Sequence, residues 1–388
     1  MSGKSYLEKL LDGVAVEWKA LGTVTKVLRG KRLTKGQLSE NEPFPVYHGG
    51  LEPLGHYTES NRPSNTVMII NVGASAGTVG YSHMDFWSSD GCFCLEHNAL
   101  IDNRFLYFAM IGHQTFLRSR VRVAGIPTLD ANVIEMLQIP IPCPENPKKS
   151  LEIQAEIVRI LDTFSELTAE LTAELTARKK QYNYFRDQLL KFEDGEVGWK
   201  PLGKIAENLD SLRKPVTSGL RDAGEIPYYG ASGIVDYVKD YIFDGDFLLI
   251  SEDGANLIAR NTPIAFSIRG KSWVNNHAHV LKFNTYAERR FVEFYLNNID
   301  LTPYISGAAQ PKLNQRNLNT INIPNPSLEE KEYIVSILDK FDTLTSSIAE
   351  GLPREIELRQ KQYEYYRDQL LSFPPSPSRP PPLQGGGA

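Results

Sequence analysis

Lysine and arginine residues gather in one short segment near the start of this sequence. Residues 26–35 hold five cations and no acid, and the five are Lys26, Arg29, Lys31, Arg32 and Lys35. Side chains of this kind neutralise the phosphates of nucleic acids. A single charge cluster is more often plain solvated surface, so the segment alone leaves both interpretations open.

Two further groups of polar side chains favour the nucleic-acid interpretation. Arg118, Arg120 and Arg122 alternate with Ser119 and Val121, so on a strand they would share a face, and arginine suits bidentate reading of guanine. The second half of the chain carries the other candidates, which are Arg213, Lys214, Gln310, Lys312 and Arg316. Because Arg213 aligns with Arg32, basic residues recur in both halves, which weakens the solvated-surface interpretation.

Motifs for catalysis are missing from the sequence. Residues 73–80 are rich in glycine, but no helix is expected after them as a phosphate-binding loop requires, so we interpret them as a turn. His277 and His279 could be a metal pair, yet no acid or cysteine stands near them in sequence, which favours a structural or DNA-facing element. The three cysteines lack metal-site spacing and are expected to be packing residues. We therefore expect no catalytic residue, no metal and no cofactor on this chain.

An internal duplication dominates the organisation of the chain. Residues 179–192 return as residues 360–373 with 10 of 14 positions identical, and 157–164 and 16–22 return as 334–341 and 197–203. Between the matching pieces lie two longer stretches that agree only in scattered places. The duplication thus predicts a repeated scaffold that carries two divergent globular inserts.

Both copies of the scaffold show the apolar periodicity of amphipathic helices. The spacer residues that we expect to carry this face are Leu167, Leu171, Leu175, Tyr182, Phe185, Leu189, Tyr363, Tyr366 and Leu370. A break or kink is expected at residues 351–353, with Pro353 in the first position of a new helix. Periodicity alone also suits an ordinary core helix pair, but the length of the first helix favours an antiparallel coiled coil.

The central helix contains three tandem units of four residues, Leu-Thr-Ala-Glu twice and then Leu-Thr-Ala-Arg, over residues 167–178. Each unit advances a helix by about 6 Å and turns it about 40° beyond a full turn. Helix propensity explains the composition of the units but not their tandem repetition. The units therefore predict a spacer whose length changes in discrete steps.

The expected fold class is α+β, with two mixed α/β domains separated by two long antiparallel helices. The expected segments are an N-terminal segment 1–18, a first domain 19–150, a central helix 151–195, a second domain 196–327, a distal helix 328–373 and a disordered tail 374–388. The net charge is −5, which argues against tight DNA binding by either domain alone. The chain has neither a long apolar run nor an apolar N-terminal signal, so we expect it in the cytoplasm.

With its duplicated helices, its Leu-Thr-Ala-Glu units and the shared Gln-Tyr-x-Tyr-[Phe/Tyr]-Arg-Asp-Gln-Leu-Leu block, the chain resembles the specificity subunits of type I restriction–modification systems, closest to the IC-like subgroup. The resemblance covers residues 6–373. Residues 307–313 are similar to a motif frequent in the recognition domains of that family, and the first insert keeps only Gly125, Pro127 and Leu129 of it. The N-terminal residues 6–13 resemble 188–195, which suggests a circular arrangement with the termini side by side.

The resemblance implies binding of an asymmetric, two-part sequence in double-stranded DNA. It also implies two modification subunits, which carry the methyltransferase and S-adenosylmethionine, and two restriction subunits, which carry ATP- and Mg-dependent translocation and cleavage. The alternative is a non-catalytic coiled-coil adaptor that presents two protein-binding modules. An adaptor would keep the duplication but has no need for arginine-rich segments in both inserts.

Overall fold

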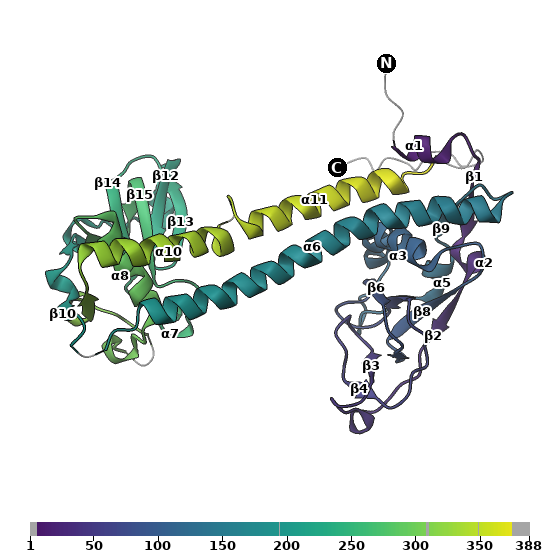
Figure 1. The fold of residues 1–388 in the computed structure, drawn as a ribbon, viewed down its shortest axis with the longest axis horizontal. Coiled ribbons are helices and arrows are strands. Elements are labelled where there is room, and N and C mark those ends of the chain that lie inside the picture. Colours follow the sequence, from purple (N-terminus) through teal and green to yellow (C-terminus); the bar gives the residue numbers. More distant parts are fainter. Residues whose placement is uncertain (1–5, 194, 308–309, 348, 375–388) are drawn as a thin grey trace, which may run out of the picture. The chain divides into compact units, whose positions relative to one another are not determined.

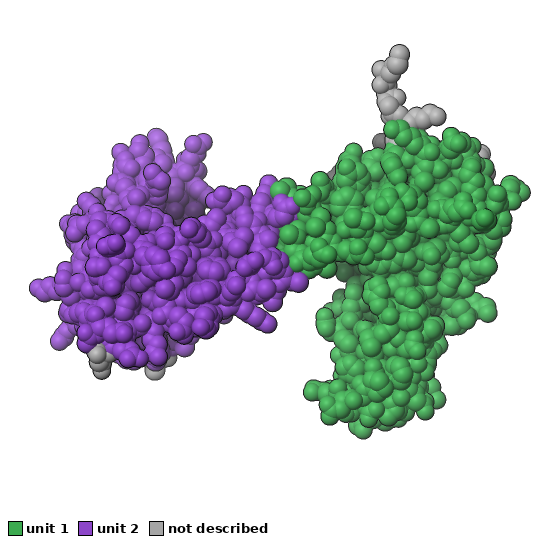
Figure 2. Space-filling model, in the orientation of Figure 1, with its two compact units in different colours: residues 1–171, 356–388 green, residues 172–355 purple. Residues whose placement is uncertain are grey.

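The structure is a computed structural model that describes residues 6–193, 195–307, 310–347 and 349–374 (Figure 1). Apart from Pro374, the tail predicted to be disordered lies outside these residues. The chain divides into two compact units (Figure 2): residues 1–171 with 356–388 form unit 1, and residues 172–355 form unit 2. Among the described helices, none is long and apolar enough to cross a membrane.

The insert of unit 1 is built on a four-stranded antiparallel sheet in the order β2-β8-β5-β6. These strands are β2 (Thr25–Arg29), β8 (Cys92–His97), β5 (Thr66–Ile70) and β6 (Val79–Ser82). A three-stranded sheet holds β3 (Phe44–Tyr47), β4 (His56–Tyr57) and β7 (Trp87–Ser88), and the short helices are α2 (Leu21–Val24), η1 (Lys35–Gln37), α4 (Gln114–Ser119) and α5 (Ala131–Glu135). Helix α3 (Asn103–Gly112) buries Phe105, Leu106 and Phe108 in the core that also contains β5 and β8.

The insert of unit 2 is built on a six-stranded sheet in the order β11-β16-β14-β15-β12-β13. Its strands are β11 (Glu207–Asn208), β12 (Ala223–Gly230), β13 (Gly233–Val238), β14 (Phe243–Ser251), β15 (Ala265–Val274) and β16 (Ala278–Lys282). The helices of this insert are η2 (Leu202–Lys204), η3 (Asp210–Leu212), η4 (Ser218–Leu220), α7 (Asn256–Ala259), α8 (Tyr286–Asn298), η5 (Thr302–Tyr304) and α9 (Gln315–Thr320). Helix α8 takes the place that α3 has in unit 1, and a capping box of Thr285 and Glu288 starts it.

Each insert is closed by a two-stranded ribbon that joins its first and last residues. In unit 1, β1 (Val16–Ala20) pairs with β9 (Gln138–Pro142), and in unit 2, β10 (Gly198–Pro201) pairs with β17 (Asn322–Asn325). Both ribbons contain Ile-Pro steps, at residues 139–142 and 323–324, and a proline favours extended backbone in the residue before it. Proline cannot donate to a ladder, but a ribbon of two edge strands tolerates it.

The scaffold consists of α6 (Pro147–Leu189), α10 (Leu328–Ser346) and α11 (Leu352–Leu371). Gly351 between α10 and α11 has φ +86°, and a Cβ there would lie 2.3 Å from the carbonyl oxygen of Thr343. The predicted break is therefore confirmed, although Pro353 takes the second rather than the first helical position. In unit 1, α6 packs on α11, and in unit 2 it packs on α10; both pairs are antiparallel (Figure 1). The boundary between the units, after Leu171, falls within the four-residue repeat.

An equivalent Arg-Asp ion pair joins each insert to its scaffold helix. Arg104 on α3 contacts Asp162 on α6 at 2.7 Å, and Arg290 on α8 contacts Asp339 on α10 at 2.8 Å. Each arginine also lies over a phenylalanine one turn further along its own helix. The two aspartates occupy the same position of the duplicated scaffold, so the duplication preserves the attachment of the inserts as well as the helices.

The N-terminal helix α1 (Tyr6–Leu11) belongs to unit 1. Leu7 and Leu11 enter the core that contains Leu370 and Phe373 at the end of α11. The Tyr6 hydroxyl donates a 3.0 Å hydrogen bond to Glu156. The first and the last described segments therefore share one core.

Candidate nucleic-acid interface

The basic segment of the first insert presents its charged side chains at the surface. All five of its cations, Lys26, Arg29, Lys31, Arg32 and Lys35, are exposed, from β2 through the following loop to η1. Lys26 lies 3.7 Å from Glu96, and Arg29 donates to the backbone oxygen of Asp90. Within the described residues, the side chains of Lys31, Arg32 and Lys35 have no ion pair with this chain, which leaves their charge open to an external anion.

The prediction of a strand for Arg118, Arg120 and Arg122 is wrong. Arg118 lies in the last turn of α4, where it donates to Thr78, and Arg120 is the C-cap of that helix, over the ring of Phe116. A helix forms because it buries Leu117 completely, and an alternation of five residues does not outweigh that burial. Arg122 lies apart from the other two, in a 2.9 Å ion pair with Asp130. The three guanidinium groups therefore share no face.

Arg122 opens a loop that we call the first recognition loop, residues 122–129. Its ends meet through paired backbone hydrogen bonds between Arg122 and Thr128, of 2.9 and 3.0 Å. Two further bonds hold it to the turn after β5: Gly73 N donates to Pro127 O, and Leu129 N donates to Asn71 O, both at 2.9 Å. The turn predicted at residues 73–80 is confirmed for residues 73–78, because β6 begins at Val79, and it anchors this loop.

Residues 306–313, the second recognition loop, repeat this arrangement in unit 2. Ser306 and Lys312 exchange two hydrogen bonds of 2.8 Å, Gly254 N donates to Pro311 O at 3.1 Å, and Leu313 N donates to Glu252 O at 2.8 Å. Gly307 has φ +85°, and a Cβ there would lie 2.4 Å from the Gln310 carbonyl oxygen, so glycine is required. The two inserts thus present the same backbone construction with different side chains; residues 308 and 309 lie outside the described part of the chain.

The exposed side chains on the two loops differ in chemistry. The first loop exposes Val123 (79%) and Ile126 (71%), whereas the second exposes Gln310 and Lys312. Arg316 is exposed on α9, directly after the second loop. Sequence reasoning missed Val123 and Ile126 because it searched for charged and amide side chains, although apolar groups also read DNA through the thymine methyl.

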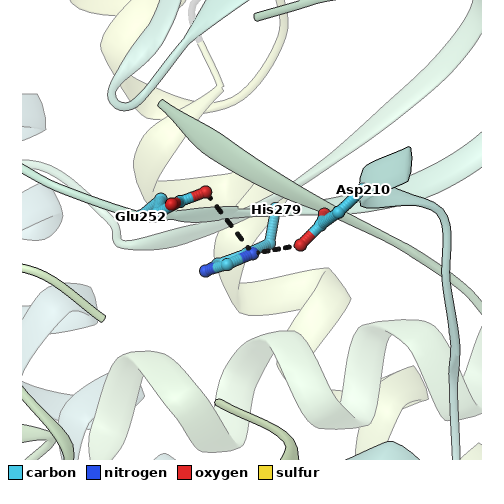
Figure 3. A group of neighbouring side chains, drawn as sticks. All are labelled: Asp210, Glu252 and His279. Atoms are coloured by element: carbon cyan, nitrogen blue, oxygen red, sulfur yellow. Dashed lines mark hydrogen bonds and ion pairs between the residues drawn. The ribbon is translucent and has the colours of Figure 1, made fainter. Parts of the chain in front are cut away.

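Behind the second loop lies a buried charge cluster that no sequence spacing indicated (Figure 3). His279 on β16 is fully buried; its Nδ1 lies 2.5 Å from Asp210 and 3.8 Å from Glu252. The other ring nitrogen, Nε2, donates to the Leu313 backbone oxygen at 2.7 Å. Neighbouring His277 likewise has an acidic partner, Asp253, at 2.8 Å. Both histidines were predicted to lack acidic neighbours, and this is wrong because their partners come from distant parts of the sequence.

Arg213 belongs to this cluster rather than to the exposed surface. Its Nη1 lies 2.6 Å from Glu252 and donates to the Ala278 backbone oxygen at 2.8 Å, and its side chain is only 13% exposed. Arg213 is therefore removed from the predicted phosphate contacts, because two buried carboxylates hold its guanidinium. Lys214 beside it remains exposed.

The carboxylates of the cluster are already neutralised by side chains of the chain. Burial raises the pKa of Asp210, but the hydrogen bond and charge of His279, the backbone N–H of Val280 and the charge of Arg213 together outweigh it, so that the pKa is lowered. Burial also raises the pKa of Glu252, and Arg213, His279 and Lys312 together lower it below its usual value. Asp210, Glu252 and His279 offer three atoms that could hold a cation. A divalent ion does not fit here, because Arg213 and Lys312 contact the two carboxylate oxygens of Glu252, His279 contacts Asp210, and these cations would repel it.

The spacer carries a second kind of candidate surface, which is aromatic. Tyr182 and Tyr363 occupy the same position of the repeat, and burial raises the pKa of each to about 12. The neighbouring pairs Tyr184 with Phe185 and Tyr365 with Tyr366 are exposed. Of the other predicted spacer residues, Leu370 is buried, and partial burial is found for Leu167, Leu171, Leu175 and Leu189. Each copy of the repeat therefore turns one tyrosine inward and one aromatic pair partly outward.

Comparisons with known proteins agree with this architecture. A family model described as "Type I restriction modification DNA specificity domain" matches twice, at residues 14–178 and 196–358. The chain is 37% identical to the specificity subunit of the Escherichia coli type I restriction enzymes EcoR124I and EcoR124II, over 96% of this chain and 98% of that one. It is 35% identical to the EcoprrI specificity subunit of the same species, over 90% and 93%.

Solved structures show the same fold. The crystal structure of a type I restriction–modification S subunit from M. genitalium superposes with a TM-score of 0.67 at 17% identity, covering 94% of this chain and 98% of that one. A chain from a study of complex assembly in a type I system superposes with a TM-score of 0.55 at 14% identity, covering 92% and 97%. With two family domains and relatives similar over nearly their whole length, this chain belongs to the specificity subunits of type I restriction–modification systems.

Proposed function

We propose that this chain binds an asymmetric, two-part DNA sequence, with one insert for each half, and recruits the subunits that act on that DNA. The observation that carries the proposal is the matched construction of the two recognition loops. In each insert two backbone hydrogen bonds close the loop, and two more join it to Asn71 and Gly73 or to their counterparts Glu252 and Gly254, while the exposed side chains differ. Two loops with the same backbone hydrogen bonds and different exposed side chains are suited to reading two different short DNA sequences.

Exposed cations supply the contact with phosphate in this proposal. Lys31, Arg32 and Lys35 serve the first insert, and Lys214, Lys312 and Arg316 serve the second. Contacts to phosphate fix the register of a protein on DNA, while contacts to base edges carry the sequence information. Gln310 in the second loop is suited to adenine, and Val123 and Ile126 in the first loop are suited to thymine methyl groups.

The scaffold is the proposed docking site for two modification subunits. The partly exposed pairs Tyr184–Phe185 and Tyr365–Tyr366 occur once in each copy of the repeat, with ring centroids 5.5 and 5.4 Å apart. Exposed aromatic pairs of this kind are common anchors of protein interfaces. Because the surface occurs twice, it suits two copies of one partner. Recruitment of two restriction subunits is part of the same proposal and rests on family membership.

Catalysis belongs to the partners in this proposal. S-adenosylmethionine is assigned to the modification subunits, and ATP and Mg to the restriction subunits. The four-residue units of α6 are assigned the role of setting the unspecific gap between the two half-sites, because the helix passes through them from one unit to the other.

Reconstitution tests this function. The chain is combined with its modification subunits, and the methylated adenines of a random DNA library are mapped. The proposal predicts methylation at one bipartite sequence with a fixed gap, and sequence-independent methylation would contradict it. The alternative of a protein-binding adaptor predicts that the complex is retained on DNA no better than the modification subunits alone.

A further inference from the structure

We propose that His279 is a positioning residue for sequence recognition, because it holds the second recognition loop in the conformation that reads the second half of the DNA target. The inference rests on the proposed function and deepens it. It concerns a side chain that is fully buried and cannot touch DNA itself.

The end of the second loop is held through both polar backbone groups of one residue. Leu313 N donates to Glu252 O, and Leu313 O accepts from His279 Nε2 at 2.7 Å. The Glu252 side chain contacts Lys312, one residue earlier in the loop, at 3.1 Å. His279 is oriented in turn by Asp210 (Figure 3). A chain of contacts therefore runs from η3 through the ring to the loop. Buried contacts of this kind are not weakened by competing water.

The first insert shows that the fold does not require the cluster. In the sheet of unit 2, Ile250 pairs with His279, and in the sheet of unit 1, Ile69 pairs with Phe93. Phe93 therefore stands in the place of His279, and Asn71 stands in the place of Glu252. The same backbone ties hold the first loop, but a phenyl ring cannot donate a hydrogen bond to Leu129 O.

A buried charge cluster carries a desolvation cost that a hydrophobic residue would avoid. Since Phe93 stands at the equivalent position beside a loop with the same backbone hydrogen bonds, forming such a loop does not require the cluster. What the cluster adds is a fixed place for Leu313 O and Lys312. The second recognition loop therefore has side-chain contacts, to Leu313 O and to Lys312, in addition to the backbone hydrogen bonds that it shares with the first recognition loop.

The test uses the complex of the full chain with its modification subunits, on the target mapped for the unaltered complex. Methylation rates are compared between the target and duplexes with one base pair changed in either half. His279→Phe installs the residue of the equivalent position and removes both hydrogen bonds. This variant should lower discrimination against changed base pairs in the second half of the target by about tenfold, the order of one base contact. Discrimination in the first half should change by less than about twofold, which is the usual effect of a distant substitution.

Two further variants separate positioning from stability. His279→Gln keeps an amide donor near the place of Nε2 and should restore most of the lost discrimination. Glu293→Gln breaks another buried ion cluster of unit 2, with Arg290, that does not touch the loop, and it should leave discrimination in both halves unchanged. Normal methylation and normal discrimination in the first half report that each variant complex is assembled.

The inference is overturned if His279→Phe discriminates as well as the unaltered complex, if His279→Gln is no better than His279→Phe, or if Glu293→Gln produces the same loss. Equal loss in both halves would also overturn it. A failure of the proposed function is distinguishable, because it would appear as absent discrimination in the unaltered complex.

Discussion

The ring of Phe164 on α6 stacks on the ring of Tyr366 on α11, with centroids 5.1 Å apart and planes 20° from parallel. The equivalent positions in unit 2 are Phe341 and Phe185, which stack at 5.6 Å and 27°. Phe164 and Phe185 come from the first copy of the scaffold, and Tyr366 and Phe341 come from the second. Each unit is therefore built from both copies, and neither copy can form a unit alone.

These stacks should stabilise the two units separately. Tyr366→Ala should lower the free energy of unfolding of unit 1, and Phe185→Ala that of unit 2, each by about 1–2 kcal/mol, since both rings are partly exposed. Native-state hydrogen exchange, which resolves the two units, is the measurement. Tyr333→Ala on α10 is the control, because its ring is exposed and outside the stacks. If either variant lowered the protection against hydrogen exchange equally in both units, the two stacks would not stabilise their units separately.

The basic segment of the first insert should govern the salt dependence of DNA binding. Replacing Lys31, Arg32 and Lys35 with glutamine should weaken binding to all sequences alike and flatten the plot of log K against log salt by about 0.9 for each lost contact. Replacing Lys180, Lys191 and Lys340, which are exposed on the scaffold and its flank, with glutamine removes the same three charges and is the control for a change of net charge. An unchanged slope would assign the segment to solvated surface.

Acid should destabilise unit 2 through the cluster around His279. The pKa values of Asp210 and Glu252 are lowered in the folded chain, so the stability that they contribute is present above their unfolded values of about 4 and is lost as pH falls through the folded values. The free energy of unfolding of unit 2 should therefore drop below about pH 4, and less steeply in Asp210→Asn. Burial raises the pKa of Glu293, which acts in the opposite direction, so both proteins keep Glu293. If the free energy of unfolding fell with pH at the same slope in both proteins, Asp210 would not contribute to the acid sensitivity of unit 2.

The scaffold was predictable because near-identical repeats reveal it directly. Residues 179–192 and 360–373 show the helices, and Gly351 shows the break between α10 and α11. The charge cluster was not predictable, because Asp210 and His279 lie 69 residues apart in the sequence and only the sheet brings them together. A strand was expected for Arg118 and Arg120 because five alternating residues suit a strand as well as a short helix. The helix forms because it buries Leu117.

The loop side of the hydrogen bonds that hold the two recognition loops could be recognised in the sequence. Gly125, Pro127 and Leu129 were aligned with the motif at residues 307–313, and the backbone hydrogen bonds of Pro127 and Leu129 match those of Pro311 and Leu313. The residues that accept the hydrogen bonds from Leu129 and Leu313, which are Asn71 and Glu252, were not predicted, because their side chains differ in chemical type. Both act through backbone oxygens, which any residue supplies.

The four-residue units of α6 should set the gap between the half-sites. One further Leu-Thr-Ala-Glu after Glu174 lengthens the helix by about 6 Å and turns it about 40° beyond a full turn. With DNA rising about 3.4 Å per base pair, the gap should widen by one or two base pairs; the rotation, close to the twist of one pair, favours one. Methylation of duplexes that differ only in gap length is the measurement. Activity that stays at the original gap would show that α6 does not set the spacing.

The central claim, that each insert reads its own half of one DNA sequence, is tested most directly by exchanging a single insert. Residues 20–150 are replaced with the corresponding residues of a related specificity subunit, and the methylated sequences of the reconstituted complex are mapped. The account predicts that one half of the target changes to that of the donor while the other half stays the same. A change in both halves, or in neither, would contradict it.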